Sequence, residues 1–228
     1  IGLVGSEMCI RDRYDIDILP HVYDGGLSVG ALRYAVGHDF DIDNFPYCQD
    51  DYAPEEVSDE TIVKASELLA QGKIIGWYQG HGEIGPRALG NRSILMSPMI
   101  KNGKDILNSR VKKREWWRPF GASVLEEKAG EYFDIECSPY MLYNSKVKQS
   151  GLDPITHVDG TCRHQTVTYE SNPAFYKLIS AFEKRTGCPI LLNTSLNIGG
   201  KPIAGRLEDA KVSGLDALFV GNEIYEKL

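Results

Sequence analysis

The chain has 228 residues, of which 42% are hydrophobic, and a formal net charge of −7. This apolar content can fill a core, but no apolar run approaches the roughly 20 residues that a membrane-spanning helix needs. The negative charge argues against a broad nucleic-acid surface and leaves room only for a local basic pocket. The five cysteines lack C-x-x-C spacing, which predicts reduced thiols in a cytoplasmic protein rather than zinc ligands or disulfides.

The first residues look foreign to a folded protein. Met8–Asp12, MCIRD, can be encoded by ATG-TGT-ATA-AGA-GAC, which resembles the transposase end sequence used to build sequencing libraries. We therefore expect residues 1–13 to be a translated sequencing artefact and the chain to be truncated upstream. A natural disordered terminus is the alternative, and resequencing the source locus would distinguish the two.

The segment that follows predicts a short strand, a glycine turn and a helix. Asp17–Leu19 supplies the strand, the glycine pair at 25–26 the turn, and the small apolar residues 27–36 the helix. Residues 38–56 are acidic and contain two prolines, which is typical of a linker.

A larger unit begins near Ser58, which can cap a helix that has two acidic residues in its first turn. Gly72 fits the end of that helix, and Lys73–Tyr78 follows as a strand. A second helix opens at Asn172-Pro173. Two more buried strands are predicted, at Pro189–Leu192 and Ala217–Val220. Because helices alternate with strands, residues 58–228 predict an α/β domain with a twisted, open and partly parallel sheet flanked by helices.

Gly80–Gly85 fits the G-x-G-x-x-G pattern of dinucleotide-binding loops. In that fold the third glycine lies in a helix that packs on the sheet, whereas here Pro86 and Gly90 would interrupt one. We therefore set aside a nicotinamide or flavin site in this loop.

The charges of the same loop suggest a different ligand. Arg87 and Arg92 lie among glycines, which let backbone N–H groups approach a ligand, while guanidinium groups bind phosphate or carboxylate. An arginine pair bonded to local carbonyls or to Glu83 is the alternative.

Further polar clusters follow along the chain. They are NSRVKKREWWRPF at residues 108–120, THVDGTCRHQTV at 156–167 and PILLNTSLN at 189–197. A strand that stops in small polar residues delivers them to the carboxyl end of a sheet, where α/β proteins bind ligands. If the clusters converge, they form a pocket for more than one phosphate-like group.

Six motifs resemble those of a known family, the carbamoyltransferases of the nodulation-protein and antibiotic-tailoring type. They are GEIGPRALGNRSIL, NSRVKKREWWRPF, PYM, HVDGTCRHQTV, CPILLNTSLN and LEDA, in the family's order. The resemblance implies a YrdC-like domain, similar to threonylcarbamoyl-adenylate synthase, over residues 58–228. HVYDGGLSVGAL resembles the last segment of the family's actin-like ATPase (Kae1-like) domain, so residues 14–50 are expected to be the tail of that domain and a linker.

The resemblance also implies a two-step chemistry. The YrdC-like domain takes carbamoyl phosphate and ATP, with Mg²⁺ on the nucleotide, and forms carbamoyl adenylate. The Kae1-like domain then transfers the carbamoyl group to an acceptor hydroxyl, often on a sugar or an antibiotic-like metabolite, beside a divalent or iron metal. Since the first step needs no covalent nucleophile, positioning and charge neutralisation carry it.

By the resemblance, Lys112 and Arg118 contact the phosphates of carbamoyl phosphate and ATP, and Arg163 is a third catalytic cation. Ser195 and Asn197 are expected to hold the nucleotide phosphates. The other substrate-binding or ATP-binding candidates are Arg87, Arg92, Asn108 and Gln165. Lys113 and Arg114 could instead be structural ion-pair partners.

Asp24 corresponds to a metal-binding aspartate of the Kae1-like domain, although on its own it could equally shape the turn at Gly25-Gly26. His81 stands where the family often has arginine, which would weaken one anion contact. For His21, His157 and His164 a structural or hydrogen-bonding role is the first expectation.

Two alternative functions remain open at this point. One is a threonylcarbamoyl-adenylate synthase-like enzyme, and the other is a non-catalytic YrdC-like module that binds RNA. RNA binding would need an extended basic face with stacking aromatics, which the net charge disfavours. We therefore expect small-molecule partners and neither nucleic acid nor membrane.

Overall fold

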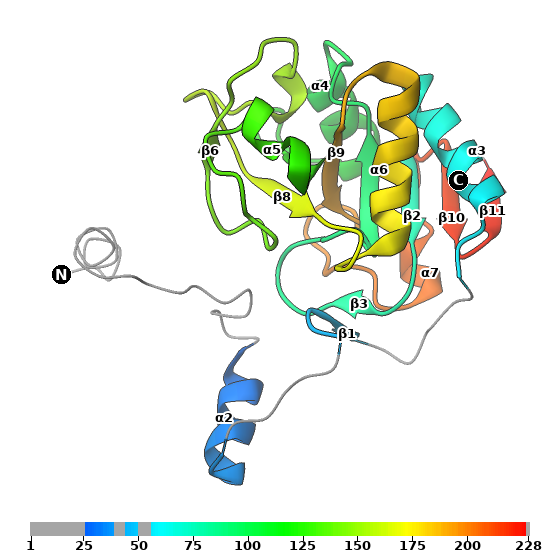
Figure 1. Cartoon of the computed structure of the whole chain (residues 1–228). Coiled ribbons are helices and arrows are strands. Elements are labelled where there is room, and N and C mark those ends of the chain that lie inside the picture. Colours follow the sequence, from blue (N-terminus) through cyan, green and yellow to red (C-terminus); the bar gives the residue numbers. More distant parts are fainter. Residues whose placement is uncertain (1–25, 39–43, 50–55, 227–228) are drawn as a thin grey trace.

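The computed structural model describes residues 26–38, 44–49 and 56–226 (Figure 1). Its centre is a seven-stranded sheet in the order β11-β10-β2-β4-β9-β5-β8. The strands are β2 (Ile75–Tyr78), β4 (Arg92–Met96), β5 (Gly121–Leu125), β8 (His164–Val167), β9 (Ile190–Ser195), β10 (Ala217–Val220) and β11 (Glu223–Glu226). β10 pairs with β2, and β5 with β8, in parallel, while the other neighbours are antiparallel. The predicted partly parallel α/β sheet is therefore confirmed.

Two long helices, α3 (Asp59–Ala70) and α6 (Pro173–Thr186), pack against each other on one face of this sheet (Figure 1). Both begin where the sequence predicts. The Ser58 hydroxyl accepts a hydrogen bond from Thr61 N at 3.2 Å, and Asn172 Oδ1 accepts one from Phe175 N at 3.1 Å. Each bond satisfies a backbone donor that the first turn would leave unpaired.

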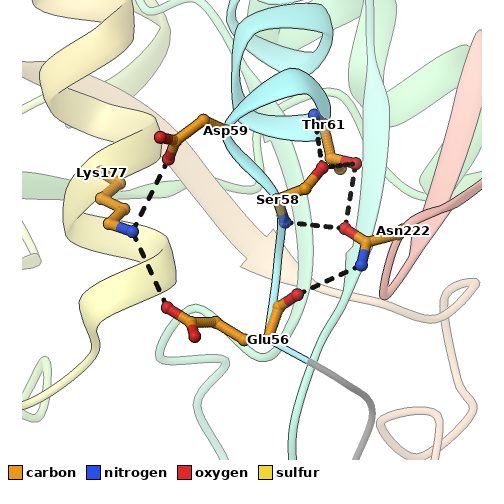
Figure 2. A network of polar contacts seen from close by, with 6 residues as sticks. All are labelled: Glu56, Ser58, Asp59, Thr61, Lys177 and Asn222. Carbon is orange, nitrogen blue, oxygen red and sulfur yellow. Dashed lines mark hydrogen bonds and ion pairs between the residues drawn. The ribbon is translucent and has the colours of Figure 1, made fainter.

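The start of α3 is tied to the rest of the domain by a polar network (Figure 2). Lys177 of α6 lies 3.6 Å from the Asp59 carboxylate and 3.9 Å from that of Glu56. Asn222, in the turn between β10 and β11, accepts from Ser58 N at 2.8 Å and donates to the Glu56 carbonyl at 3.1 Å. The start of α3 is thus anchored both to α6 and to the turn between β10 and β11.

The core lies between the sheet and its helices. Its largest fully buried aromatic side chains include Trp77, Phe175, Phe182 and Phe219. Phe175 and Phe182 come from the stripe of α6 that faces the sheet, as the helical spacing of its apolar residues predicts.

Shorter elements complete the described chain. They are α2 (Leu27–Val36), β1 (Tyr47–Gln49), β3 (Gly82–Glu83), α4 (Gly103–Leu107), the π-turn η2 (Asn108–Lys112), α5 (Glu126–Tyr132), β6 (Ser145–Lys146), the 3₁₀ turn η3 (Asp153–Ile155), β7 (Thr161–Cys162) and α7 (Leu207–Ala210). The possible helix over 105–114 therefore takes the form of α4 continued by η2, and it ends at Lys113, whose φ is 47°.

The predicted helix at 27–36 is confirmed as α2, and none of its residues is buried. Its apolar side chains include Leu27 and Leu32, which are 71% and 52% exposed. The predicted artefact at 1–13, the strand at 17–19 and Asp24 lie outside the described residues. Within the part of the chain that the structure describes, no helix is long and apolar enough to cross a membrane.

Candidate functional site

The candidate site lies at the end of the sheet where β2 and β9 finish and β4 begins. The antiparallel register places Ser93 of β4 opposite Ser195 of β9, and Arg92 opposite Tyr78 of β2. The loop of residues 79–91, called here the arginine loop because it carries Arg87, connects β2 to β4 across this end. Between Ile84 and Asn91 this loop contains no helix, in agreement with the rejection of a dinucleotide site.

The buried carboxylate of Glu83 organises the arginine loop. Its Oε1 accepts hydrogen bonds from the backbone N–H groups of Leu89 at 2.7 Å, Asn91 at 2.8 Å and Arg92 at 3.1 Å. Hydrogen bonds to an ionised acceptor are stronger than those between neutral groups. Glu83 therefore fixes the backbone on either side of Gly90, three residues after Arg87.

Arg92 closes the base of the loop. It is only 1% exposed. Its guanidinium donates to the carbonyls of Gln79 at 2.6 Å, Gly80 at 2.9 Å and Asn91 at 3.1 Å, and it lies 3.7 Å from the ring centroid of Tyr78. Arg92 therefore follows the alternative stated for it above, an arginine bonded to local backbone carbonyls. A direct contact between Arg92 and substrate stays a prediction.

A pocket of about 270 Å³ lies beside the arginine loop. Its basic groups come from segments far apart in the sequence: Arg87, Arg114, His157 and Arg163. Ser195 contributes at the carboxyl end of β9. All of the lining residues belong to the described part of the chain, and none of them carries a carboxylate. The pocket is therefore suited to an anion.

The basic groups that line the pocket have lowered pKa values, for which burial is the largest cause. Burial lowers the pKa of Arg87, and the neighbouring charge of Arg163 lowers it further. Burial also lowers the pKa of Arg114, with a smaller contribution from Arg118, and it lowers the pKa of His157. An anion in the pocket would relieve the repulsion between Arg87 and Arg163.

Lys112 lies behind Ser195. It is 1% exposed, and its Nζ donates to the carbonyl oxygens of Ser195 at 2.7 Å and Asn197 at 3.0 Å. The same nitrogen lies 2.6 Å from Asn197 Oδ1 and 3.3 Å from Ser195 Oγ. Burial, followed by repulsion from Arg114, lowers the pKa of Lys112 to about 7. The Nζ of Lys112 is thus surrounded by protein acceptors and contacts Ser195, which lines the pocket, and a direct contact of Lys112 with substrate stays a prediction.

Arg118 and Asn108 take different positions from the ones expected. The side chain of Arg118 is 46% exposed, lies 3.3 Å from the Glu115 carboxylate and does not line the pocket. Asn108 donates to the carbonyls of Trp116 and Arg118, and its Oδ1 accepts from Arg114 Nε at 2.7 Å. Asn108 therefore orients Arg114 toward the site. A direct contact of Arg118 or Asn108 with substrate stays a prediction.

Gln165 supports the pocket from within the core. It is 2% exposed, its Nε2 donates to the Leu89 carbonyl at 2.8 Å, and its Oε1 accepts from Ser123 Oγ at 2.8 Å. These contacts brace the arginine loop against β5 and β8, so Gln165 stays only a predicted ligand-binding residue.

Among the predicted site residues, the structure brings Arg87, Arg163 and Ser195 together in one pocket. It also adds residues that sequence reasoning did not place there. His157 could have been found, because it lies six residues before Arg163 in the same motif. Asn144 could not have been found from the sequence, because it is a single amide in a segment without other candidate site residues. Arg114, considered above as an ion-pair partner, lines the pocket instead.

Metal binding was expected at Asp24, which lies outside the described residues. Within residues 26–38, 44–49 and 56–226, no group of three or more His, Cys, Asp or Glu side chains is placed to hold a metal ion.

Comparison with known proteins identifies the family of the chain. The family model "Carbamoyltransferase C-terminus" matches residues 66–227. The chain belongs to this family. It is 47% identical over 183 residues to the nodulation protein NolNO of Sinorhizobium fredii, a match that covers 75% of this chain and 27% of that protein. It is 45% identical over 170 residues to the 3'-hydroxymethylcephem-O-carbamoyltransferase of Streptomyces clavuligerus, covering 72% of this chain and 32% of that enzyme. The chain thus spans less than a third of the length of either relative.

Among solved structures, Sua5 of P. abyssi, crystallised with L-threonine, superposes with a TM-score of 0.50 at 13% sequence identity. The match covers 77% of this chain and 50% of that one. At this identity the likeness concerns the fold, and it shows that the carbamoyltransferase C-terminal domain has a YrdC-like architecture.

Proposed function

We propose that this carbamoyltransferase domain binds carbamoyl phosphate and ATP at the pocket beside Arg87 and Arg163 and forms carbamoyl adenylate there. The observation that carries the proposal is the convergence of Arg87, Arg114, His157 and Arg163 on a pocket without an acidic lining residue. Among the described residues, neither Arg87 nor Arg163 forms an ion pair with a carboxylate. Their charges are therefore available to a ligand.

The proposed reaction brings several anions together. Water cleaves carbamoyl phosphate to carbamate and phosphate, and a carbamate oxygen then attacks the α-phosphorus of ATP, so that pyrophosphate leaves. Each step needs cations that offset the repulsion between substrates, and prearranged arginine forks provide this at the smallest cost in reorganisation. The protein supplies position and charge, as in other phosphoryl transfers.

In this scheme Lys112 would contribute indirectly, through Ser195 and Asn197. Its Nζ holds both Ser195 and Asn197, so it fixes the polar end of β9 against the pocket. A positive charge directly behind Ser195 also raises the potential at the pocket wall. Because Lys112 has a pKa near neutrality, anion binding would favour its charged form.

The second half of the proposed function is transfer of the carbamoyl group to an acceptor hydroxyl in the Kae1-like domain. Mg²⁺ on ATP and a divalent or iron metal at that domain, with Asp24 as one ligand, belong to this proposal. The acceptor in the Streptomyces clavuligerus relative is a hydroxymethylcephem by that enzyme's name. For this chain the acceptor class remains a hydroxyl compound.

Release of pyrophosphate from ATP tests the first half directly. We expect the chain to release pyrophosphate only when carbamoyl phosphate is present, and Arg163→Ala to lower the rate by a factor on the order of 100 to 1000. Arg163→Lys should restore only part of it, because an ammonium cannot form the planar fork. Arg206→Ala, at an exposed arginine outside the pocket, is the matched control.

Two outcomes would overturn the proposal. One is pyrophosphate release that is the same with and without carbamoyl phosphate. The other is release that requires threonine and bicarbonate instead, which would favour the threonylcarbamoyl-adenylate synthase-like alternative.

A further inference from the structure

A short segment outside the family match covers the arginine loop. Residues 44–49, called here the strap, include β1, which pairs antiparallel with β3 of the loop (Figure 1). Tyr47 lies opposite Glu83 in this pairing, and the Pro46 carbonyl accepts from Ile84 N at 2.8 Å. The family model begins at residue 66, so it does not include the strap.

The side chain of Tyr47 reaches under the loop. Its hydroxyl donates to the Leu89 carbonyl at 2.9 Å, the same oxygen that accepts from Gln165 Nε2 at 2.8 Å. The Leu89 N–H is bonded to Glu83. The backbone of Leu89 is therefore held at its carbonyl by Tyr47 and Gln165 and at its N–H by Glu83. Arg87 lies two residues before Leu89.

The strap also contacts the segment that carries Met141. The ring of Phe45 packs edge-on against Tyr140, with 6.1 Å between the centroids. Met141, the next residue after Tyr140, lines the pocket. A six-residue segment thus contacts both the loop that carries Arg87 and the segment that carries Met141.

We propose that Tyr47 is a positioning residue for the anion pocket: it holds the Leu89 carbonyl, and through the Leu89 backbone the orientation of Arg87, so that strap docking and anion binding favour each other. Because Tyr47 acts through Arg87, its role rests on the proposed function of the pocket. The strap joins the upstream segment to the domain, so its docking would couple the state of that segment to substrate binding. By linkage, an anion in the pocket must stabilise the docked strap by the same free energy.

The experiment measures the Kd of inorganic pyrophosphate for the whole 228-residue chain by calorimetry. Tyr47→Phe keeps the ring and removes the hydroxyl, and we expect it to raise the Kd about threefold to tenfold, the effect of one lost hydrogen bond. Tyr34→Phe is the matched control, because Tyr34 is upstream in α2 and 90% exposed. Arg87→Ala should raise the Kd by more than Tyr47→Phe does.

A double-mutant cycle separates positioning from a general loss of structure. In the Arg87→Ala background, Tyr47→Phe should change the Kd by less than twofold, because the contact through which it acts is gone. Hydrogen exchange gives the reciprocal readout. Pyrophosphate should slow exchange at the Tyr47 and Ile84 amides in the wild type and leave it unchanged in Arg87→Ala. Because this measurement uses only the wild type and Arg87→Ala, it tests the coupling between strap docking and anion binding even if Tyr47→Phe unfolds.

The possible results distinguish the proposed role of Tyr47 from anion binding by the pocket itself. If Arg87→Ala weakens binding while Tyr47→Phe does not, or if Tyr47→Phe weakens binding equally in both backgrounds, the role of Tyr47 is overturned and the pocket stands. If wild-type chain binds no pyrophosphate, or if Arg87→Ala has no effect, the pocket itself is overturned, and the role of Tyr47 with it.

Discussion

The ammonium nitrogen of Lys112 lies 2.6 Å from Oδ1 of Asn197 in a site where no described carboxylate pairs with it. The acceptors around it are amide, carbonyl and hydroxyl oxygens. They satisfy its hydrogens without supplying a negative charge, so burial dominates and the pKa falls to about 7.

This pKa predicts that anion binding takes up a proton. Above about pH 7 the free protein holds Lys112 neutral, whereas a bound anion favours the charged form and moves its pKa upward. The affinity for pyrophosphate should therefore fall as pH rises from about 7 toward 9, and the loss should be smaller in Lys112→Met. Calorimetry on both proteins across this range checks it. Since protonation of pyrophosphate itself affects both proteins alike, equal pH slopes would contradict the prediction.

Arg118 provides a direct test of what the family resemblance assigns. The resemblance places it on a substrate phosphate, while the structure shows it half-exposed beside Glu115. If Arg118 turns to the substrate in the complex, Arg118→Ala should slow pyrophosphate release by a factor on the order of 100 and leave the melting temperature unchanged. Lys128→Ala, at another half-exposed cation paired with a nearby glutamate, is the control. A normal rate in Arg118→Ala would remove this residue from the site.

The sequence predicted elements and clusters better than it predicted which side chains face the ligand. The caps at Ser58 and Asn172 are local signals, and both are confirmed. Arg87 and Arg92 looked equivalent in the sequence, yet one lines the pocket and the other is buried under its own loop. That difference depends on contacts with Tyr78 and Gln79, which the register of β2 against β4 creates. Local sequence patterns do not reveal which residue of β2 pairs with which residue of β4.

Long-range contacts explain the other differences. Gln165 lies in a motif that looks like a binding segment, but its amide accepts from Ser123 and donates to Leu89, so protein groups already occupy both ends of it. The strap could not be predicted either. Tyr47 lies in an acidic stretch that is typical of a linker, and only the pairing with β3 shows what it contacts.

Glu83 should be essential to the stability of the arginine loop. Glu83→Gln keeps an acceptor for the three N–H groups but removes its charge, and it puts an amide NH2 group in place of Oε2, an oxygen that has no hydrogen-bond partner among the described residues. We expect the free energy of unfolding to fall by about 2 kcal/mol. Urea denaturation measures it, with the exposed Glu170→Gln as control. Equal stability of the two variants would show that the charge contributes nothing.

Gly90 should tolerate no side chain. Its φ is +109°, and a Cβ there would lie 2.2 Å from Cδ1 of the buried Phe175. Gly90→Ala should therefore cost about 3 kcal/mol or more, from backbone strain and overpacking together. Gly205→Ala, where no atom lies within 4 Å of the added carbon, should change stability by less than about 1 kcal/mol. Thermal unfolding compares the two, and similar melting temperatures would contradict the close contact with Phe175.

His164 should make the fold sensitive to acid. It is fully buried, stacks on Phe133 with 4.2 Å between ring centroids, and its Nδ1 lies 2.9 Å from Ser145 Oγ. Burial lowers the pKa of His164 to about 4 from the ordinary value of 6.5. Between these pH values the unfolded chain binds a proton that the native state does not. The stability that His164 contributes is therefore complete above pH 6.5 and is lost as pH falls toward 4. The difference between the two pKa values corresponds to about 3 kcal/mol of unfolding free energy.

The measurement is the difference in unfolding free energy between wild type and His164→Asn at pH 7 and at pH 4.5, because carboxylates add a pH dependence of their own to both proteins. We expect this difference to shrink in acid, with the exposed His38→Asn showing no such change. Parallel curves for wild type and His164→Asn would mean that His164 is protonated in the native state as readily as in the unfolded chain.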